Sequence, residues 1–106
     1  FARLGILPGL GSTHLLPKLV GMARAQELVL TARVILAEEA AAIGLVNRTV
    51  PGESLIDEAR SMAAAMAECP APVLAAAKRA LYFGAESSMA EAMENERAQS
   101  ELLRKR

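Results

Sequence analysis

The stretch LGILPGLGST, residues 4–13, is the most informative part of the sequence. Residues 1–7 predict a short extended segment, and the two glycines within Pro8–Ser12 predict a tight turn after it. The serine and threonine that close the stretch are available to cap a helix. We expect that helix to be short, because Pro17 restricts the residue before it and lacks a backbone donor.

Downstream of this turn, the sequence predicts about six short helices joined by short loops. Apolar spacing predicts a helix over Met22–Leu30 and another over Ala37–Ile43, which Gly44 ends. Residues 45–50 contain valine and threonine before a Pro-Gly pair and predict a short strand. The later helices are expected over Leu55–Glu68 after a Ser54 cap, over Val73–Tyr82 up to Gly84, and after a capping box of Ser88 and Glu91. The predicted fold class is mostly α, with one or two short strands.

Composition points to a helical chain that needs further surface to pack against. The 106 residues form one domain or part of one, and they are 53% hydrophobic but only 3% aromatic. Alanine occurs 22 times, and it favours helices while burying little apolar area per residue. We therefore expect these helices to meet the rest of a larger fold or another subunit. The chain begins at Phe1 rather than methionine, which we interpret as a truncated start.

Charge and cysteine content exclude several classes of function. Twelve basic and twelve acidic side chains give no net charge, which argues against nucleic-acid binding or attraction to an anionic membrane. Cys69 is the only cysteine, so neither an intrachain disulfide nor a Cys-based metal site is expected, and a cytoplasmic setting fits. The longest charge-free stretch, residues 4–17, is too short and too broken by proline and glycine to span a bilayer.

Taken one at a time, the polar residues do not identify a catalytic site. His14 is a conceivable general base, but no nucleophile or carboxylate pairs with it in the sequence, so an ordinary helix residue is the simpler interpretation. Residues 9–12 could hold an anion or a carbonyl at a helix N-terminus, or simply form a turn. Lys78 and Arg79 could contact a phosphate or lie at a solvated helix end. The five methionines are expected to fill the core, and Glu38 and Glu39 to stabilise a first turn.

The order of the motifs carries more information than any one of them. Residues 4–13 resemble the segment written LGxxPGxGGT in the enoyl-CoA hydratase/isomerase (crotonase) family. The blocks that follow in the family's order are residues 15–21, 27–31, 37–40, 44–47, 50–51 and 76–81. They cover nearly the whole chain, and the family resemblance rests on their shared order and spacing.

The resemblance implies an architecture and a substrate class. Residues 1–106 would be the C-terminal, mostly helical part of a ββα spiral (α/β) fold. C-terminal helices of that fold make trimer contacts, so a homo-oligomer, a trimer or a dimer of trimers, is expected. The substrate would be a coenzyme A thioester, with no separate cofactor and no metal.

The resemblance also assigns roles to three residues. Leu4 matches a residue near the acyl chain, and Gly9 matches the glycine whose N–H helps hold the reacting water. Phe1 occupies the position of the second catalytic glutamate, and phenylalanine cannot transfer a proton. The other catalytic glutamate and both oxyanion donors are expected upstream of these residues. Removal of one oxyanion donor typically lowers the catalytic rate by ~10²–10³-fold.

Two further departures and one missing element complete the comparison with the family. Ala32 and Leu36 stand where a glycine and a serine or aspartate are usual, which affects local turn geometry. The family's last helix, which helps cover the coenzyme, is expected after Arg106. Two functional hypotheses follow: part of an acyl-CoA-processing enzyme that is inactive by itself, or a non-catalytic helical oligomerisation module derived from that family.

Overall fold

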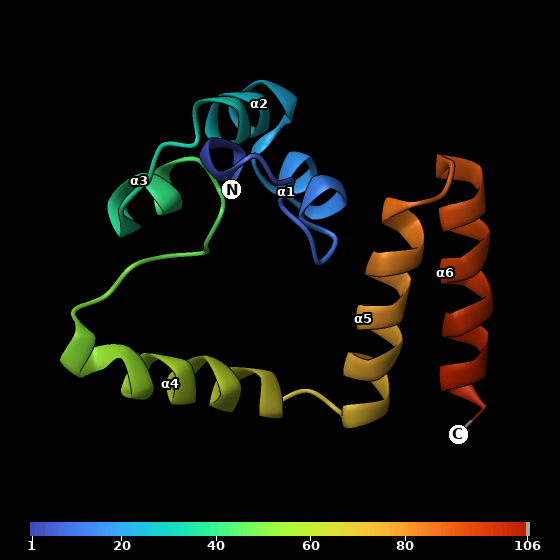
Figure 1. The fold of residues 1–106 in the computed structure, drawn as a ribbon. Helices are drawn as coiled ribbons and strands as arrows, with labels where there is room; N and C mark the ends of the chain where they lie inside the picture. Colours follow the sequence, from blue (N-terminus) through green and yellow to red (C-terminus); the bar gives the residue numbers. More distant parts are fainter. Residues whose placement is uncertain (106) are drawn as a thin grey trace. The chain divides into compact units, whose positions relative to one another are not determined.

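A computed structural model describes residues 1–105, and within them all regular structure is helical. The chain forms two compact units, residues 1–51 and the residues from Gly52 onward. Each unit contains one packed pair of helices (Figure 1). The prediction of a mostly α chain is confirmed. Among the described residues, no helix has the length and apolarity that crossing a bilayer requires.

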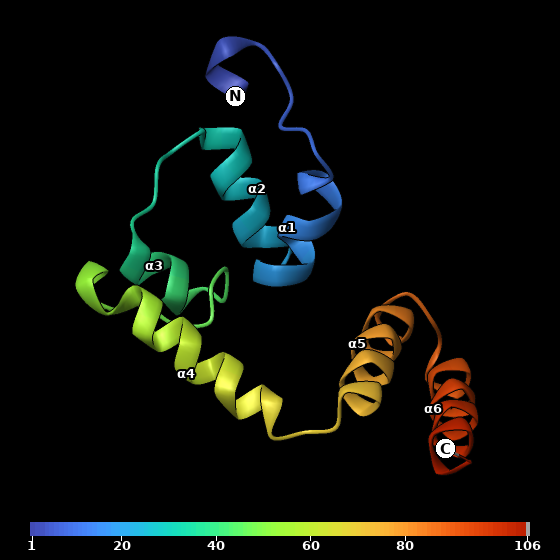
Figure 2. The ribbon, with the colours of Figure 1, turned by 90° about the horizontal axis from the view of Figure 1, so that it is seen from below.

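The first unit is built on a corner between two helices. Its elements are η1 (Ala2–Leu4), α1 (Ser12–Val20), α2 (Met22–Thr31) and α3 (Ala37–Ala42). Gly21 alone joins α1 to α2 with φ 86° and ψ 159°, a backbone region open essentially only to glycine. This turn lets α1 and α2 pack side by side, as Figure 2 also shows. Val20 and Ala25 are buried there.

The second unit is a helical hairpin preceded by a third helix. Its elements are η2 (Gly52–Ser54), α4 (Leu55–Ala67), α5 (Ala71–Ala85) and α6 (Met89–Arg104). Helices α5 and α6 pack against each other, and Ala76 is buried there. The predicted capping box begins α6: Ser88 Oγ accepts from the Glu91 amide at 3.2 Å, and Glu91 Oε1 accepts from the Ser88 amide at 3.1 Å.

The predicted strands are wrong. Residues 45–50 form a bend and an irregular segment, and residues 2–4 form the single turn η1 in place of an extended segment. A strand needs a neighbour to complete its hydrogen bonds, and residues 1–105 contain no other strand. The β-branched residues near Val50 therefore favour an extended backbone, but the described residues contain no second strand with which they could pair.

Two helix boundaries and one helix cap also differ from those expected. Pro17 lies inside α1, and the helix continues for one more turn to the buried Val20. Helix α5 begins at Ala71, since Pro72 is tolerated in a first turn, and Gly84 lies within it near its end. Helix α4 does begin after Ser54, but no side-chain hydrogen bond from Ser54 caps it.

The methionines do not fill a core. The residues buried in the structure are Val20, Ala25, Ala40 and Ala76, whereas all five methionines are exposed. Helix α4 buries none of its residues, although its apolar positions recur at helical spacing. Amphipathic helices have thus formed in this chain without their apolar faces being covered.

Candidate functional site

The glycine-rich turn leads directly into α1. Leu10 and Gly11 take positive φ values of 60° and 83°, and the Ser12 amide donates to the Gly9 carbonyl at 3.1 Å. Gly11 is the N-cap, so Ser12 begins the helix instead of capping it. A Cβ added at Gly9 would meet no atom within 4 Å, so this part of the turn is open. Ser12 Oγ is buried without a hydrogen-bond partner among residues 1–105.

A pocket of about 320 Å³ in the first unit brings together segments that are distant in the sequence. Phe1, Ala2 of η1 and Pro8 contribute to its lining, and the remaining residues come from α1, α2 and the link to α3: Leu16, Leu28, Val29, Ala32, Arg33 and Val34. The side chains are mostly apolar, with Arg33 as the charged member. The pocket can accommodate an apolar group next to the Pro8–Gly9 turn.

The three site residues expected from the sequence are only partly brought together. Phe1 lines the pocket but is 68% exposed. Leu4 follows in η1, is 77% exposed and does not line the pocket. Gly9 adjoins the lining residue Pro8. The position matched to a catalytic glutamate thus lies beside an apolar pocket and carries no group that can transfer a proton.

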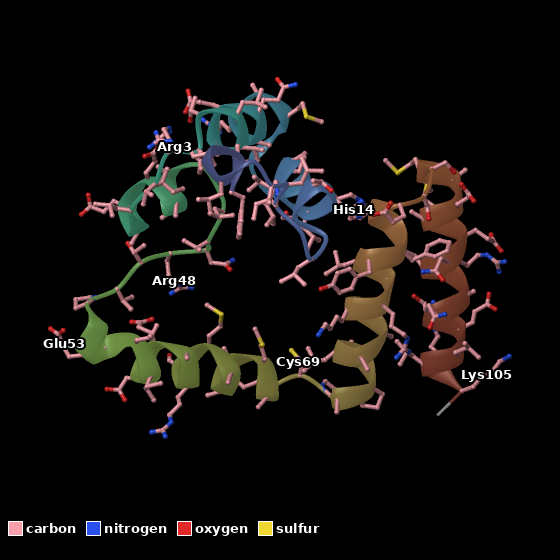
Figure 3. All side chains as sticks on the ribbon, viewed as in Figure 1. Arg3, His14, Arg48, Glu53, Cys69 and Lys105 are labelled. Carbon is pink, nitrogen blue, oxygen red and sulfur yellow. The ribbon has the colours of Figure 1, made fainter. Side chains whose placement is uncertain are left out.

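A charged cluster borders this pocket. Arg33 Nε and Nη2 donate to Glu27 Oε2 at 3.0 and 2.7 Å, and Arg33 Nη1 donates to Glu39 Oε1 at 3.0 Å. The bound guanidinium holds the pKa of Glu39 below its ordinary value, and the two carboxylates raise the pKa of Arg33. Nearby, Arg3 Nη2 donates to the Thr31 carbonyl at 3.4 Å (Figure 3 labels Arg3).

Sequence reasoning missed this cluster. The sequence predicts for Glu39 only a stabilising place in the first turn of a helix, and it predicts no site role for Glu27 or Arg33. A signal was present, because the two glutamates lie six residues before and six residues after Arg33. On a helix, side chains six residues apart do not lie next to each other. The Arg33 side chain meets the two glutamates only because the chain leaves the helical path at Ala32.

Other polar candidates lie away from the pocket. His14 is exposed on α1 and does not line it (Figure 3). Lys78 and Arg79 fall in the interior of α5, not at its end as expected. Arg79 borders a small pocket of about 130 Å³ with Gln99 and apolar residues of α5 and α6. In the described residues, no three His, Cys, Asp or Glu side chains gather in a way that could hold a metal ion.

Of the two positions that depart from the family pattern, only Ala32 adopts an unusual backbone geometry. Ala32 ends α2 in the left-handed region with φ 54°, which L side chains rarely adopt. Leu36 precedes α3 and provides no side-chain cap. Both residues lie in the link between α2 and α3. Ala32 lines the pocket, whereas Leu36 does not.

Comparison with known proteins gives consistent matches in sequence. The sequence model of the enoyl-CoA hydratase/isomerase family matches residues 1–105. A short-chain-enoyl-CoA hydratase of Clostridioides difficile is 44% identical over 86 residues, which is 81% of this chain and 56% of that protein. A Mycobacterium bovis protein assigned as an enoyl-CoA hydratase is 40% identical over 95 residues, which is 90% of this chain but 37% of that protein. The chain therefore spans roughly a third to a half of these relatives' length.

Solved structures give the same result for the fold. An enoyl-CoA hydratase of Bacillus anthracis superposes with a TM-score of 0.92 at 35% identity, covering 94% of this chain and 39% of that one. A Thermobifida fusca protein assigned as an enoyl-CoA hydratase, solved in complex with CoA, superposes with a TM-score of 0.90 at 36% identity. That match covers 97% of this chain and 40% of the Thermobifida chain.

Proposed function

This chain belongs to the enoyl-CoA hydratase/isomerase family, and we propose that it is part of an enzyme that processes acyl-CoA thioesters in fatty acid metabolism. The family match over residues 1–105 is the observation that carries the proposal. The apolar pocket beside the glycine-rich turn supports it, because a fatty acyl group needs an apolar surface. In this proposal Leu4 lies near the acyl chain, and the Gly9 amide helps hold a water molecule. The thioester itself is the ligand, with no separate cofactor.

We further propose that these 106 residues do not catalyse hydration by themselves. General acid–base catalysis by a positioned side chain typically contributes ~10²–10⁴-fold, and Phe1 offers no such group. None of the residues carried over from the family supplies the pair of oxyanion-hole amides. The test is to incubate the purified chain with a short-chain enoyl-CoA and follow loss of the double bond. Turnover above the uncatalysed rate would contradict this proposal.

The coding DNA upstream of Phe1 tests the proposal that this chain is part of a larger enzyme. An in-frame extension with a glycine-rich oxyanion segment and an acidic residue would support it. In a protein with that extension, Phe1→Glu should raise hydration by about 10²-fold or more, as general acid–base catalysis allows. Phe1→Gln is the matched control, because glutamine has a similar shape and cannot transfer the proton. Equal activity of the two variants would exclude proton transfer at this position.

The second candidate function is a non-catalytic oligomerisation module derived from the same family. It is favoured by the exposed apolar side chains of α4, which include Leu55, Ile56 and Met66. We infer a homo-oligomer, a trimer or a dimer of trimers, in the cytoplasm, where the exposed thiol of Cys69 would stay reduced. A well-folded, monodisperse monomer in light scattering would argue against the module.

A further inference from the structure

Thr31, at the end of α2, joins three segments of the first unit. Its hydroxyl donates to the Glu27 carbonyl at 2.6 Å and accepts from the Arg33 amide at 3.3 Å. Its carbonyl accepts from Arg3 Nη2 of η1 at 3.4 Å. The turn η1 also packs on α2. The turn η1 therefore packs on the end of α2. Leu4 is the last residue of η1, and Phe1 directly precedes this turn.

Arg33 holds this end of α2 in place. Its guanidinium is shared between Glu27 of α2 and Glu39 in the first turn of α3, with four hydrogen bonds in all. A planar guanidinium has five donors in a fixed arrangement and can serve two carboxylates at once. The Arg33 side chain is about a third exposed, at 36%, so solvent screens these ion pairs and their direct contribution to stability is small. Their geometric effect is larger, because they fix the direction in which the chain leaves α2.

We propose that Arg33 is a positioning residue for the candidate site. It fixes the link between α2 and α3, which forms the wall of the 320 Å³ pocket that Phe1 also lines, and it fixes the end of α2 that receives η1. The effect on substrate preference, but not the geometric effect, rests on the acyl-CoA function proposed above. Without the guanidinium, no side chain would join Glu27 of α2 to Glu39 of α3, and the link with its pocket wall would lose the hydrogen bonds that fix its direction.

The substitutions come in matched pairs. Arg33→Met removes the charge and keeps an unbranched chain, and Arg33→Lys keeps the charge without the planar group. Arg97→Met is the control, because Arg97 in α6 is likewise shared between two carboxylates, Glu94 and Glu101. All residues that line the pocket fall within residues 1–34, and Arg97 forms its ion pairs within α6, so Arg97→Met removes no contact of the pocket wall. Glu39→Gln provides a milder variant that keeps the Arg33–Glu27 pair if Arg33→Met fails to fold.

The first readout is the methyl NMR spectrum of the full chain. Arg33→Met, or Glu39→Gln in its place, should shift the methyl signals of Leu4 and Val34 and leave those of Leu102 unchanged. Arg97→Met should do the reverse. Unchanged Leu4 and Val34 signals in the Arg33 and Glu39 variants would overturn the proposal, as would equal shifts in Arg97→Met.

The second readout is made in the protein that carries the upstream extension and Phe1→Glu, and it is the ratio of kcat/KM for long-chain and short-chain enoyl-CoA substrates. A displaced wall should change this ratio by about tenfold, the scale at which a pocket discriminates by one methylene. We expect Arg33→Met to show that change and Arg33→Lys part of it, whereas Arg97→Met should leave the ratio as it is. A general loss of activity at constant ratio would overturn the positioning role. If no such extension exists, or if the extended Phe1→Glu protein shows no turnover, the proposed function fails, and the methyl spectra alone decide on Arg33.

Discussion

Ala32 ends α2 in a conformation that its side chain disfavours. Its φ of 54° lies in the left-handed region, which costs an L residue roughly 1–2 kcal/mol. The family pattern has glycine at this position, and the geometry explains why. The alanine is held there between Thr31 and Arg33, whose hydrogen bonds fix the chain on both sides.

We predict that Ala32→Gly stabilises the first unit. Glycine removes most of the left-handed strain but adds freedom to the unfolded chain, so the net gain should be about 0.5–1 kcal/mol. Ala32→Val is the opposite control, because a β-branched residue tolerates this region worst and should lower stability. Chemical denaturation of the three proteins measures both effects. A loss of stability in Ala32→Gly would mean that Ala32 is not strained in the native protein.

At the scale of single elements, α6 has the most complete helix start. Ser88 and Glu91 satisfy each other's backbone amides, whereas the Ser54 side chain makes no capping hydrogen bond at the start of α4. We predict that Ser88→Ala lowers stability by about 1 kcal/mol, and that Ser54→Ala has a smaller effect. Amide hydrogen exchange in the first turn of each helix measures the difference. Equal effects of the two substitutions would show that the capping box contributes little.

The same capping box should make α6 sensitive to acid. Hydrogen bonds from Ser88, first from its side chain and then from its backbone, hold the pKa of Glu91 below its ordinary value of 4.5. A lowered folded-state pKa means that the stabilisation is fully present above about pH 4.5 and is lost as the pH falls through the folded-state pKa.

We therefore expect α6 to lose protection against hydrogen exchange as the pH falls below about 4.5, after correction for the intrinsic exchange rate. Glu91→Gln keeps an acceptor for the Ser88 amide and removes the titrating group. This variant should show a smaller change over the same range. If both proteins respond to acid alike, other carboxylates dominate the acid response of this helix.

The sequence predicted helices where the signal was local. The Ser88–Glu91 box, the glycine after Ile43 and the apolar stripe of α2 each specify a structure within one or two turns, and each prediction is confirmed. The strand at residues 45–50 failed because a strand depends on a partner that local propensity does not supply. For the site, the resemblance assigned roles to Phe1, Leu4 and Gly9, and the structure places Phe1 and the neighbour of Gly9, Pro8, on one pocket. The role of Arg33 could not be predicted, because its pairing depends on how α3 folds back toward α2.

At the scale of the whole chain, the exposed surface is too large for a protein of this size that packs only against itself. The described chain exposes 8566 Å². A compact monomer of 11.2 kDa would expose about 5,700 Å², and even two separate compact units of half that mass would expose about 6,900 Å² in total. Much of the excess is apolar, because large side chains such as Leu7, Leu10 and Val34 are more than four-fifths exposed.

We predict that the 106-residue chain is only marginally stable when dilute and gains stability by association. Apolar patches larger than a few hundred Å² mark surfaces that are covered in the functional state. Anilinonaphthalene sulfonate should bind the dilute chain, thermal unfolding should be broad, and the mass from light scattering should rise with concentration. A leucine-to-lysine change at Leu55, which is 58% exposed on α4, should reduce association without unfolding the helix. Sharp, concentration-independent unfolding of a monomer would show instead that four buried residues suffice to stabilise this fold.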